Sequence, residues 1–275
     1  MSTITGRRER PIISCVTFDT IKVSDPVKLY DATKVHLIHY IFDPTSEKGK
    51  IYQKFYDRVC YLIREKSQNI PIIEHNANVT NFTEMLKTVY GIIENEYDLN
   101  PSSDVFVNIS AGSSEYAAAA AIASMMFPGT IPFSVATDKY QVEETDIYFN
   151  KEGNPVGLAK SVKEPKVIPK YQVNSPDEKL VLGLKILNCL NDSGTPPKGP
   201  IMIYLLKKNK LWRRGEFPEE SRNRSEAVYY QRDFVNLWLS ENWIYKDKYT
   251  KKYYLTECGM IVLKTFYVDK NITYQ

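Results

Sequence analysis

The residues best suited to chemistry lie between Asp104 and Met126, in the string DVFVNISAGSSEYAAAAAIASMM. There a short β-type run meets the small polar loop Ser110–Ser114, and a long alanine-rich helix follows. Such a loop attracts anions, because the first N–H groups of a helix lack intrahelical partners and the helix dipole is positive at that end. The loop therefore predicts a seat for a phosphate-bearing ligand. The simpler alternative is that Ser113 or Ser114 only caps a buried helix.

Other signatures of catalysis and of cofactors are missing from the sequence. The three histidines, His36, His39 and His75, fall on or just after expected strands, and His36 and His39 should point to opposite faces of one strand. No GxSxG elbow surrounds Ser110, no GxGxxG follows the first strand, and GxxxxGK[ST] does not occur. We therefore predict structural roles for the histidines, no catalytic residue, no metal site and no cofactor.

Length and composition are those of an ordinary globular protein of two modest domains or one large domain. The chain has 275 residues, of which 43% are hydrophobic and 25% charged. Its four cysteines, Cys15, Cys60, Cys189 and Cys258, show no CxxC spacing, which favours buried thiols over disulfides or zinc. No apolar stretch approaches the roughly 20 residues that span a bilayer, and Met1–Arg10 is polar, so we expect a cytoplasmic location without membrane contact.

The N-terminal part alternates between β-rich and helical patterns. Strands are expected at Pro11–Phe18, Lys34–Phe42, Ile70–Glu74, Val105–Ile109 and Ile131–Thr137, and helices at Pro26–Thr33, Gly49–Ser67, Phe82–Tyr97 and the alanine-rich segment. This alternation predicts the α/β class, with a Rossmann-like, doubly wound parallel sheet over residues 1–162.

Ligands of such sheets bind beyond the carboxyl ends of the strands, near the point where strand order reverses. Three segments have suitable chemistry: the loop after the first strand, the loop after the fourth, and Thr137–Tyr140 after the last. The candidate ligand-binding residues are Thr17, Phe18, Asp19, Thr20, Asn108, Ser110, Ala111, Gly112, Ser113, Ser114 and Thr137.

The C-terminal third has the pattern of a winged helix-turn-helix domain. Prolines mark residues 163–175 as a semi-rigid linker, and a domain over residues 176–275 starts with a helix capped by Ser175. Further helices are expected at Ile201–Lys208 and Ser221–Ser240, then a hairpin formed by Trp243–Tyr249 and Lys252–Leu255, and a closing helix at Glu257–Thr265.

Charge is mildly uneven along the chain, in the direction expected for nucleic-acid binding by this third, and an ordinary solvated surface is the simpler alternative. From Tyr171 onward we count 17 Lys+Arg and 12 Asp+Glu, a net +5, which leaves −2 for the rest of a chain of net charge +3. The third helix would read base edges and the hairpin would reach phosphates. The candidate DNA-binding residues are Arg222, Arg224, Tyr229, Tyr230, Arg232 and Asn236 on the helix and Lys248, Lys251 and Lys252 on the hairpin.

Together these features resemble the CARF family, the CRISPR-associated Rossmann fold regulators with a C-terminal winged helix. The match is concentrated in Asn108–Ser114 and Trp243–Leu263. In the family the loop after the fourth strand reads N-x-[ST]-G-G-[ST]-[KR], and Asn108, Ser110, Gly112 and Ser113 fit. Ala111 replaces a glycine and Ser114 replaces a basic residue.

The resemblance implies a homodimeric transcriptional regulator that binds a cyclic oligoadenylate, expected to be cyclic tetra-adenylate, across its two-fold axis. The paired winged helices would bind a palindromic double-stranded DNA operator, with half-sites one helical turn apart. Two alternatives stay open: a ring nuclease that cleaves the cyclic oligoadenylate, and a sensor whose winged helix contacts protein instead of DNA.

Overall fold

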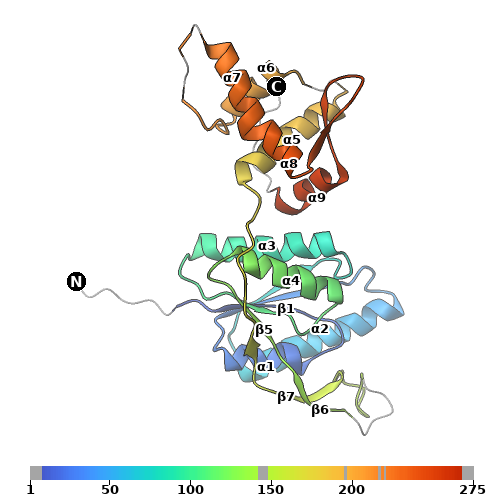
Figure 1. Ribbon diagram of the computed structural model, residues 1–275. Helices are drawn as coiled ribbons and strands as arrows, with labels where there is room; N and C mark the ends of the chain where they lie inside the picture. The colour runs from blue at the N-terminus through green and yellow to red at the C-terminus, as the bar shows by residue number, and fades with distance from the viewer. Residues whose placement is uncertain (1–7, 142–147, 195–196, 216–217, 220, 268–275) are drawn as a thin grey trace, which may run out of the picture. The chain divides into compact units, whose positions relative to one another are not determined.

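A computed structural model describes residues 8–141, 148–194, 197–215, 218–219 and 221–267 (Figure 1). The chain divides into two compact units, Met1–Asn174 and Ser175–Gln275, which we call unit 1 and unit 2. Unit 1 is an α/β unit built on one sheet, and unit 2 consists of helices with a two-stranded hairpin.

The sheet of unit 1 has the Rossmann-like order β3-β2-β1-β4-β5-β8. Its strands are β1 (Pro11–Cys15), β2 (Lys34–His39), β3 (Ile72–Asn76), β4 (Phe106–Asn108), β5 (Ile131–Ser134) and β8 (Lys166–Val167). The first five are parallel to one another, and β8 pairs antiparallel with β5 at the edge. A separate ribbon pairs β6 (Thr137–Tyr140) with β7 (Ala159–Val162). The predicted fold class is confirmed.

Helices cover both faces of this sheet (Figure 1). The helices α1 (Ile21–Leu29) and α2 (Glu47–Lys66) lie on one face, and α3 (Phe82–Leu99) and α4 (Ser114–Met126) lie on the other. The small buried side chains Ala119, Ala120 and Ala123 explain the alanine-rich sequence of α4, since they let its backbone come close to its neighbours.

The first helix begins earlier than its sequence suggests. We expected a loop before Pro26, whereas α1 starts at Ile21 and contains Pro26. A proline inside a helix leaves the carbonyl four residues earlier without its N–H partner. Here that carbonyl belongs to Lys22, and the side-chain Nδ2 of Asn108 donates to it at 2.8 Å. The cost of the proline is thus partly offset by a side chain from β4.

Two segments expected outside the sheets are part of them. Thr137–Tyr140 is strand β6 and not a loop, because it pairs with β7. The expected linker 163–175 contains β8, which pairs with β5, and Lys170 Nζ donates to the carbonyls of Phe127, Pro128 and Thr130. The prolines of this segment lie at other positions and do not prevent the backbone pairing. The pairing therefore fixes most of the segment to unit 1.

Unit 2 has the predicted order of three helical stretches, a hairpin and a closing helix. Its elements are α5 (Glu178–Asp192), α6 (Gly199–Lys208), α7 (Arg222–Tyr230), the π-helix η1 (Gln231–Val235), α8 (Asn236–Ser240), β9 (Ile244–Lys246), β10 (Tyr253–Leu255) and α9 (Glu257–Phe266). The cap of α5 is Asp177 and not Ser175, since the Asp177 carboxylate accepts from the Leu180 N–H. Trp238 is fully buried in the core, where its indole N–H donates to the Leu180 carbonyl.

Candidate functional site

The loops after β1 and β4 meet where the strand order reverses. Strand β1 pairs with β2 on one side and with β4 on the other, so the carboxyl ends of β1 and β4 are neighbours. Gly112 lies so close to β1 that a Cβ there would be 2.7 Å from the Cβ of Cys15, and its φ is +104°. Burial raises the pKa of the Cys15 thiol to about 12, so it stays protonated beneath the loop. The structure thus brings the two predicted loops together.

Asn108 links the first helix to the loop after β4. Its side chain is completely buried, and besides donating to Lys22 it accepts at Oδ1 from the backbone N–H of Ser110 at 3.0 Å and from its hydroxyl at 2.5 Å. All of these partners are within the protein. The side chain of Asn108 therefore holds α1 against the β4–α4 loop, and ligand binding by Asn108 stays a prediction.

Two further predicted side chains are also buried. Thr20 is 2% exposed and its hydroxyl donates to the Val156 carbonyl at 2.7 Å, while Ala111 is 3% exposed and packs in the core. Thr137, at the start of β6, is half-buried and pairs with Val162. Thr17, Phe18 and Asp19 stay partly exposed at the end of β1. Burial raises the pKa of Asp19, and Lys22, 3.6 Å away, opposes that shift.

Ser113 and Ser114 begin α4 and differ in accessibility. Ser113 is the N-cap, and its hydroxyl accepts from the Tyr116 N–H at 3.0 Å and donates to the Val79 carbonyl. Ser114 is exposed, and its hydroxyl donates to the Glu115 carboxylate at 3.1 Å. The capping role of Ser113 is thus real. Ser114 is the loop residue left open to solvent, with an acidic neighbour instead of a basic one.

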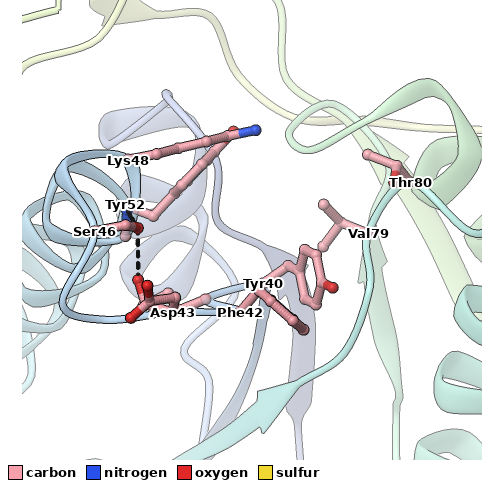
Figure 2. Close-up of a pocket in the computed structure, with 10 residues that line it drawn as sticks. Tyr40, Phe42, Asp43, Ser46, Lys48, Tyr52, Val79 and Thr80 are labelled. Atoms are coloured by element: carbon pink, nitrogen blue, oxygen red, sulfur yellow. Dashed lines mark hydrogen bonds between the residues drawn. The ribbon is translucent and has the colours of Figure 1, made fainter.

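A cavity of about 350 Å³ opens beside this loop, at the carboxyl ends of β2 and β3 (Figure 2). It is lined by Tyr40, Ile41, Phe42, Asp43, Ser46, Lys48, Gly49, Tyr52, Val79 and Thr80. Lys48 and Tyr52 project from α2 on one side, and Val79 and Thr80 lie across from them. Because Ser113 donates to the Val79 carbonyl, the cap of α4 is tied directly to this wall.

The floor of the cavity is built from a tightly bonded turn. Asn76 of β3 accepts from the Ile41 N–H at 3.0 Å and donates to its carbonyl at 3.1 Å. The Asp43 carbonyl accepts from the Ser46 hydroxyl at 2.7 Å, and a Cβ on Gly49 would be 1.9 Å from that same carbonyl oxygen. Hydrogen bonds from Thr45 lower the pKa of Asp43 and keep it anionic.

Sequence reasoning missed this cavity. We expected a strand through Phe42, whose side chain would then be buried, whereas β2 ends at His39 and Phe42 is 85% exposed. One signal could have revealed it. The run Asp43-Pro44-Thr45-Ser46 is a turn followed by a helix cap, which ends the strand earlier and leaves Tyr40 and Phe42 on a loop.

The histidines form hydrogen bonds on opposite faces of β2, as predicted. His36 Nδ1 lies 2.9 Å from His75 Nε2, and His36 Nε2 lies 3.1 Å from the Glu96 carboxylate, which also accepts from Lys34 at 2.9 Å. His39 contacts Glu74 at 2.7 Å on the other face. Among the described residues, no group of three or more His, Cys, Asp or Glu side chains could hold a metal ion.

In unit 2 the predicted helix residues differ in exposure. Arg222, Arg224, Arg232 and Asn236 are exposed along α7, η1 and α8. Tyr229 lies between two guanidinium groups, 4.5 Å from that of Arg232 and 4.8 Å from that of Arg214.

Tyr230 does not belong with these residues. It is 7% exposed and packs in the core, because it faces inward one residue after Tyr229, and burial raises its pKa well above the usual range. Tyr230 therefore does not share the exposed face of Arg222, Arg224, Arg232 and Asn236, and its contact with DNA stays a prediction.

The hairpin presents its lysines at a well-ordered turn. Asp247 Oδ1 accepts from the backbone N–H groups of Tyr249 at 3.0 Å and Thr250 at 2.6 Å. Lys248 and Lys251 are exposed and Lys252 is partly exposed. Three lysines thus lie within five residues on a rigid tip.

No helix among the residues that the structure describes is long and apolar enough to cross a membrane.

One family model matches part of unit 1, and solved structures show weak likenesses over most of the chain. Residues 12–140 match the family model described as "HFX_2341_N:-like, N-terminal". No curated protein matches. Among solved structures, the chain is similar to Enterococcus italicus Csm6 bound to cyclic hexa-2′-fluoro-hexa-dAMP, with 14% identity, a TM-score of 0.44, and coverage of 85% of this chain and 58% of that one.

Two further structures have lower TM-scores. Can2 from Sulfobacillus thermosulfidooxidans in complex with cyclic tetra-adenylate has 12% identity, a TM-score of 0.34, and coverage of 94% of this chain and 64% of that one. Protein VC1899 from Vibrio cholerae has 12% identity, a TM-score of 0.35, and coverage of 92% and 64%. The chain therefore spans about three fifths of the length of the structures that it matches.

Proposed function

We propose that this chain is a ligand-responsive DNA-binding regulator of the CARF type. Unit 1 would bind a cyclic oligoadenylate at the carboxyl edge of its sheet, and unit 2 would act as a winged helix. The observation that carries the proposal is the position of Ser110–Ser114, which follows β4 and adjoins the end of β1 where ligands of such sheets bind. A unit with three lysines on a hairpin and arginines on its third helix occurs in the same chain.

Binding of an anionic ligand at this loop can be tested by substituting the exposed Ser114. Glu115 beside it already disfavours phosphate, so a second carboxylate should weaken binding further and a cation should strengthen it. We expect Ser114→Glu to lower the affinity for cyclic tetra-adenylate about ten-fold and Ser114→Arg to raise it, both measured by calorimetry at low salt.

Ser114→Gln is the matched control, because it has nearly the size of glutamate without its charge. Equal affinities for the Glu, Gln and Arg variants would show that no phosphate lies at this loop. A stoichiometry of one ring per two chains would support the homodimer that the resemblance implies.

DNA binding by unit 2 is tested at Arg224 and Arg232. We expect the double variant Arg224→Ala, Arg232→Ala to bind duplex DNA at least ten-fold more weakly. The magnitude of the slope of log K against log salt should fall by about 2, because a protein with two fewer phosphate contacts releases fewer counterions from the DNA when it binds. The control, Lys179→Ala with Lys198→Ala, removes the same charge from α5 and from the residue before α6. If both double variants lost the same DNA affinity, net charge alone would explain the loss, and Arg224 and Arg232 would have no specific role.

Coupling between the two units would make the protein a regulator. If cyclic tetra-adenylate changes the affinity for DNA by some factor, DNA must change the affinity for the ligand by the same factor. Measuring both in one buffer tests this reciprocity. Binding of each partner without any mutual effect would contradict the regulatory part of the proposal.

A further inference from the structure

The cavity beside the β4–α4 loop has the features of a site for a flat, neutral ring. Its walls include the aromatic side chains Tyr40, Phe42 and Tyr52. Phe42 is 85% exposed although the turn that carries it is held by Asn76. A rigid turn that presents a phenylalanine to solvent beside an open cavity leaves an apolar surface that a stacked ring would cover.

Tyr52 is shared by two cavities. A second cavity, of about 360 Å³, is lined by Phe18, Lys48, Ile51, Tyr52, Tyr148 and Phe149. Phe18 packs against Tyr52 with ring centroids 5.0 Å apart, and Lys48 Nζ lies 5.8 Å from the Tyr52 ring centroid. The contacts with Phe18 and Lys48 restrict the orientation of the Tyr52 ring, so its position beside the first cavity is set before a ligand binds.

The charges in the first cavity select a base over a phosphate. Asp43 is anionic and lies at the floor, where it repels phosphate and accepts from N–H donors. The one lysine among the lining residues, Lys48, projects from α2 beside Tyr52, and its side chain extends away from Asp43. A volume of about 350 Å³ lies near the lower end of the roughly 300–1,000 Å³ common for ligand pockets, so it suits one nucleoside and not a ring of several nucleotides.

We propose that this cavity binds one purine base of a nucleotide ligand, stacked on Tyr52 and Phe42 with its amino edge toward Asp43. This inference rests on the proposed function, because the rest of the ligand would lie along the Ser110–Ser114 loop. Val79 lines the cavity and accepts from Ser113, so the two places are continuous. Each ring of the purine adds stacking area, so adenosine is preferred over cytidine.

Two variants test the cavity in different ways. Tyr52→Leu removes the stacking surface, and Thr80→Trp fills the cavity from an exposed position without removing any core side chain. Tyr61→Leu is the matched control, since Tyr61 is also on α2, is 55% exposed and does not line either cavity. Thermal unfolding of all three variants shows whether each one folds.

The probes are adenosine 5′-monophosphate, cytidine 5′-monophosphate, ribose 5-phosphate and cyclic tetra-adenylate. In saturation-transfer NMR we expect signal on the base protons of adenosine monophosphate and a weaker effect with cytidine monophosphate. We expect Tyr52→Leu and Thr80→Trp to lower the affinity for both adenosine monophosphate and cyclic tetra-adenylate about ten-fold or more. Tyr61→Leu should change neither affinity.

The outcomes separate this inference from the proposed function. If cyclic tetra-adenylate binds the Tyr52, Thr80 and Tyr61 variants equally, the base site is wrong and the proposed ligand stands. If adenosine monophosphate binds in the cavity but cyclic tetra-adenylate does not bind, the base site stands and the proposed ligand is wrong. Equal binding of ribose 5-phosphate and adenosine monophosphate would overturn the assignment to a base.

Discussion

Buried polar side chains gather in unit 1, whereas the interior of unit 2 is almost wholly apolar. Among the described residues, the buried polar side chains of unit 1 include His36, Glu96 and Asn108, and those of unit 2 are Glu226 and Thr265. Unit 2 is filled by leucines around Trp238 and Phe234. Different forces therefore stabilise the two units. Directional bonds position the loops of unit 1, and packing alone sets most of unit 2.

This contrast can be measured separately in the two units, because their spectroscopic probes differ. All three tryptophans, Trp212, Trp238 and Trp243, lie in unit 2, so indole fluorescence follows that unit alone. The buried thiols of Cys15 and Cys60 lie in unit 1, and their reaction with a thiol reagent follows its opening.

The largest effect is expected from Trp238→Ala. Removing this fully buried side chain leaves a cavity and deprives the Leu180 carbonyl of its donor, at a cost of about 3–5 kcal/mol in the stability of unit 2. Urea unfolding followed by the remaining tryptophans measures it. The reactivity of Cys15 and Cys60 should not change. Faster reaction of Cys15 or Cys60 in this variant, assigned by peptide mapping so that Cys189 and Cys258 of unit 2 are not counted, would show that the two units unfold together, which contradicts their independence.

The second effect tests the polar interior of unit 1. Glu96→Gln removes the charge that Lys34 and His36 share, and we expect it to lower the stability of unit 1 by about 2–3 kcal/mol. Thiol protection across a urea series measures the change, with indole fluorescence as the unaffected control. A loss below about 0.5 kcal/mol would mean that solvent replaces these bonds, as it does for exposed ion pairs.

The sequence predicted most of the fold, because its signals are local. Alternating apolar runs located β1 to β5 and α2 to α4 to within a few residues, and the same was true for the order of elements in unit 2. The errors have physical causes. Pro26 was taken to begin α1, but Asn108, 82 positions beyond it in sequence, supplies a donor for the freed carbonyl. Strand β8 is two residues long and shows no periodicity.

The candidate site was predicted only in part, for a similar reason. The loop Ser110–Ser114 is contiguous, so its polar residues could be read together. The cavity combines three segments, around Phe42, Tyr52 and Val79, and only the parallel register of β2 and β3 places them side by side. The burial of single side chains could not be predicted from the sequence either. Neighbouring tyrosines 229 and 230 look alike in sequence, yet one is partly exposed and the other is core.

The third effect is a pH dependence that unit 1 should show and unit 2 should not. Burial, aided by the nearby His36, lowers the pKa of His75 from 6.5 to about 4. The unfolded chain therefore binds a proton before the folded chain does, so stability is complete above about pH 6.5 and declines from there to about pH 4. We expect a loss on the order of 1–2 kcal/mol, reduced by the partial exposure of His75.

Thiol protection of unit 1 between pH 7.5 and 4.5 measures this loss. All three histidines lie in unit 1, so the fluorescence midpoint of unit 2 should stay nearly constant down to the range where carboxylates titrate. His75→Gln is the matched variant, because it keeps a side-chain N–H and cannot gain the charge. An equally steep decline in that variant would assign the pH dependence to other groups.

Glu96 extends the decline to lower pH. Burial would raise its pKa, but the hydrogen bonds from His36 and Lys34 outweigh burial and hold the pKa below its usual value. Its contribution is therefore present above the pKa of an unfolded glutamate and is lost as the pH falls through the lower, folded pKa. The Glu96→Gln variant should lose this most acidic part of the profile.

The smallest effect compares two helix caps that have the same geometry. Ser113 accepts from the Tyr116 N–H and donates to the Val79 carbonyl in unit 1, and Thr256 accepts from the Gly259 N–H and donates to the Asn242 carbonyl in unit 2. Replacing either by alanine should cost about 1 kcal/mol of its own unit's stability, measured by the probe of that unit.

Ligand binding should separate these two variants even though their stability costs are alike. Ser113→Ala removes the hydrogen bond that ties the α4 cap to Val79 in the cavity wall, so we expect it to lower the affinity for cyclic tetra-adenylate several-fold. Thr256→Ala should leave that affinity unchanged. Calorimetry well below the unfolding temperature makes the comparison, because both variants are then fully folded. If the two variants bound the ligand equally, the bond between Ser113 and Val79 would have only the local capping role that Thr256 has in unit 2.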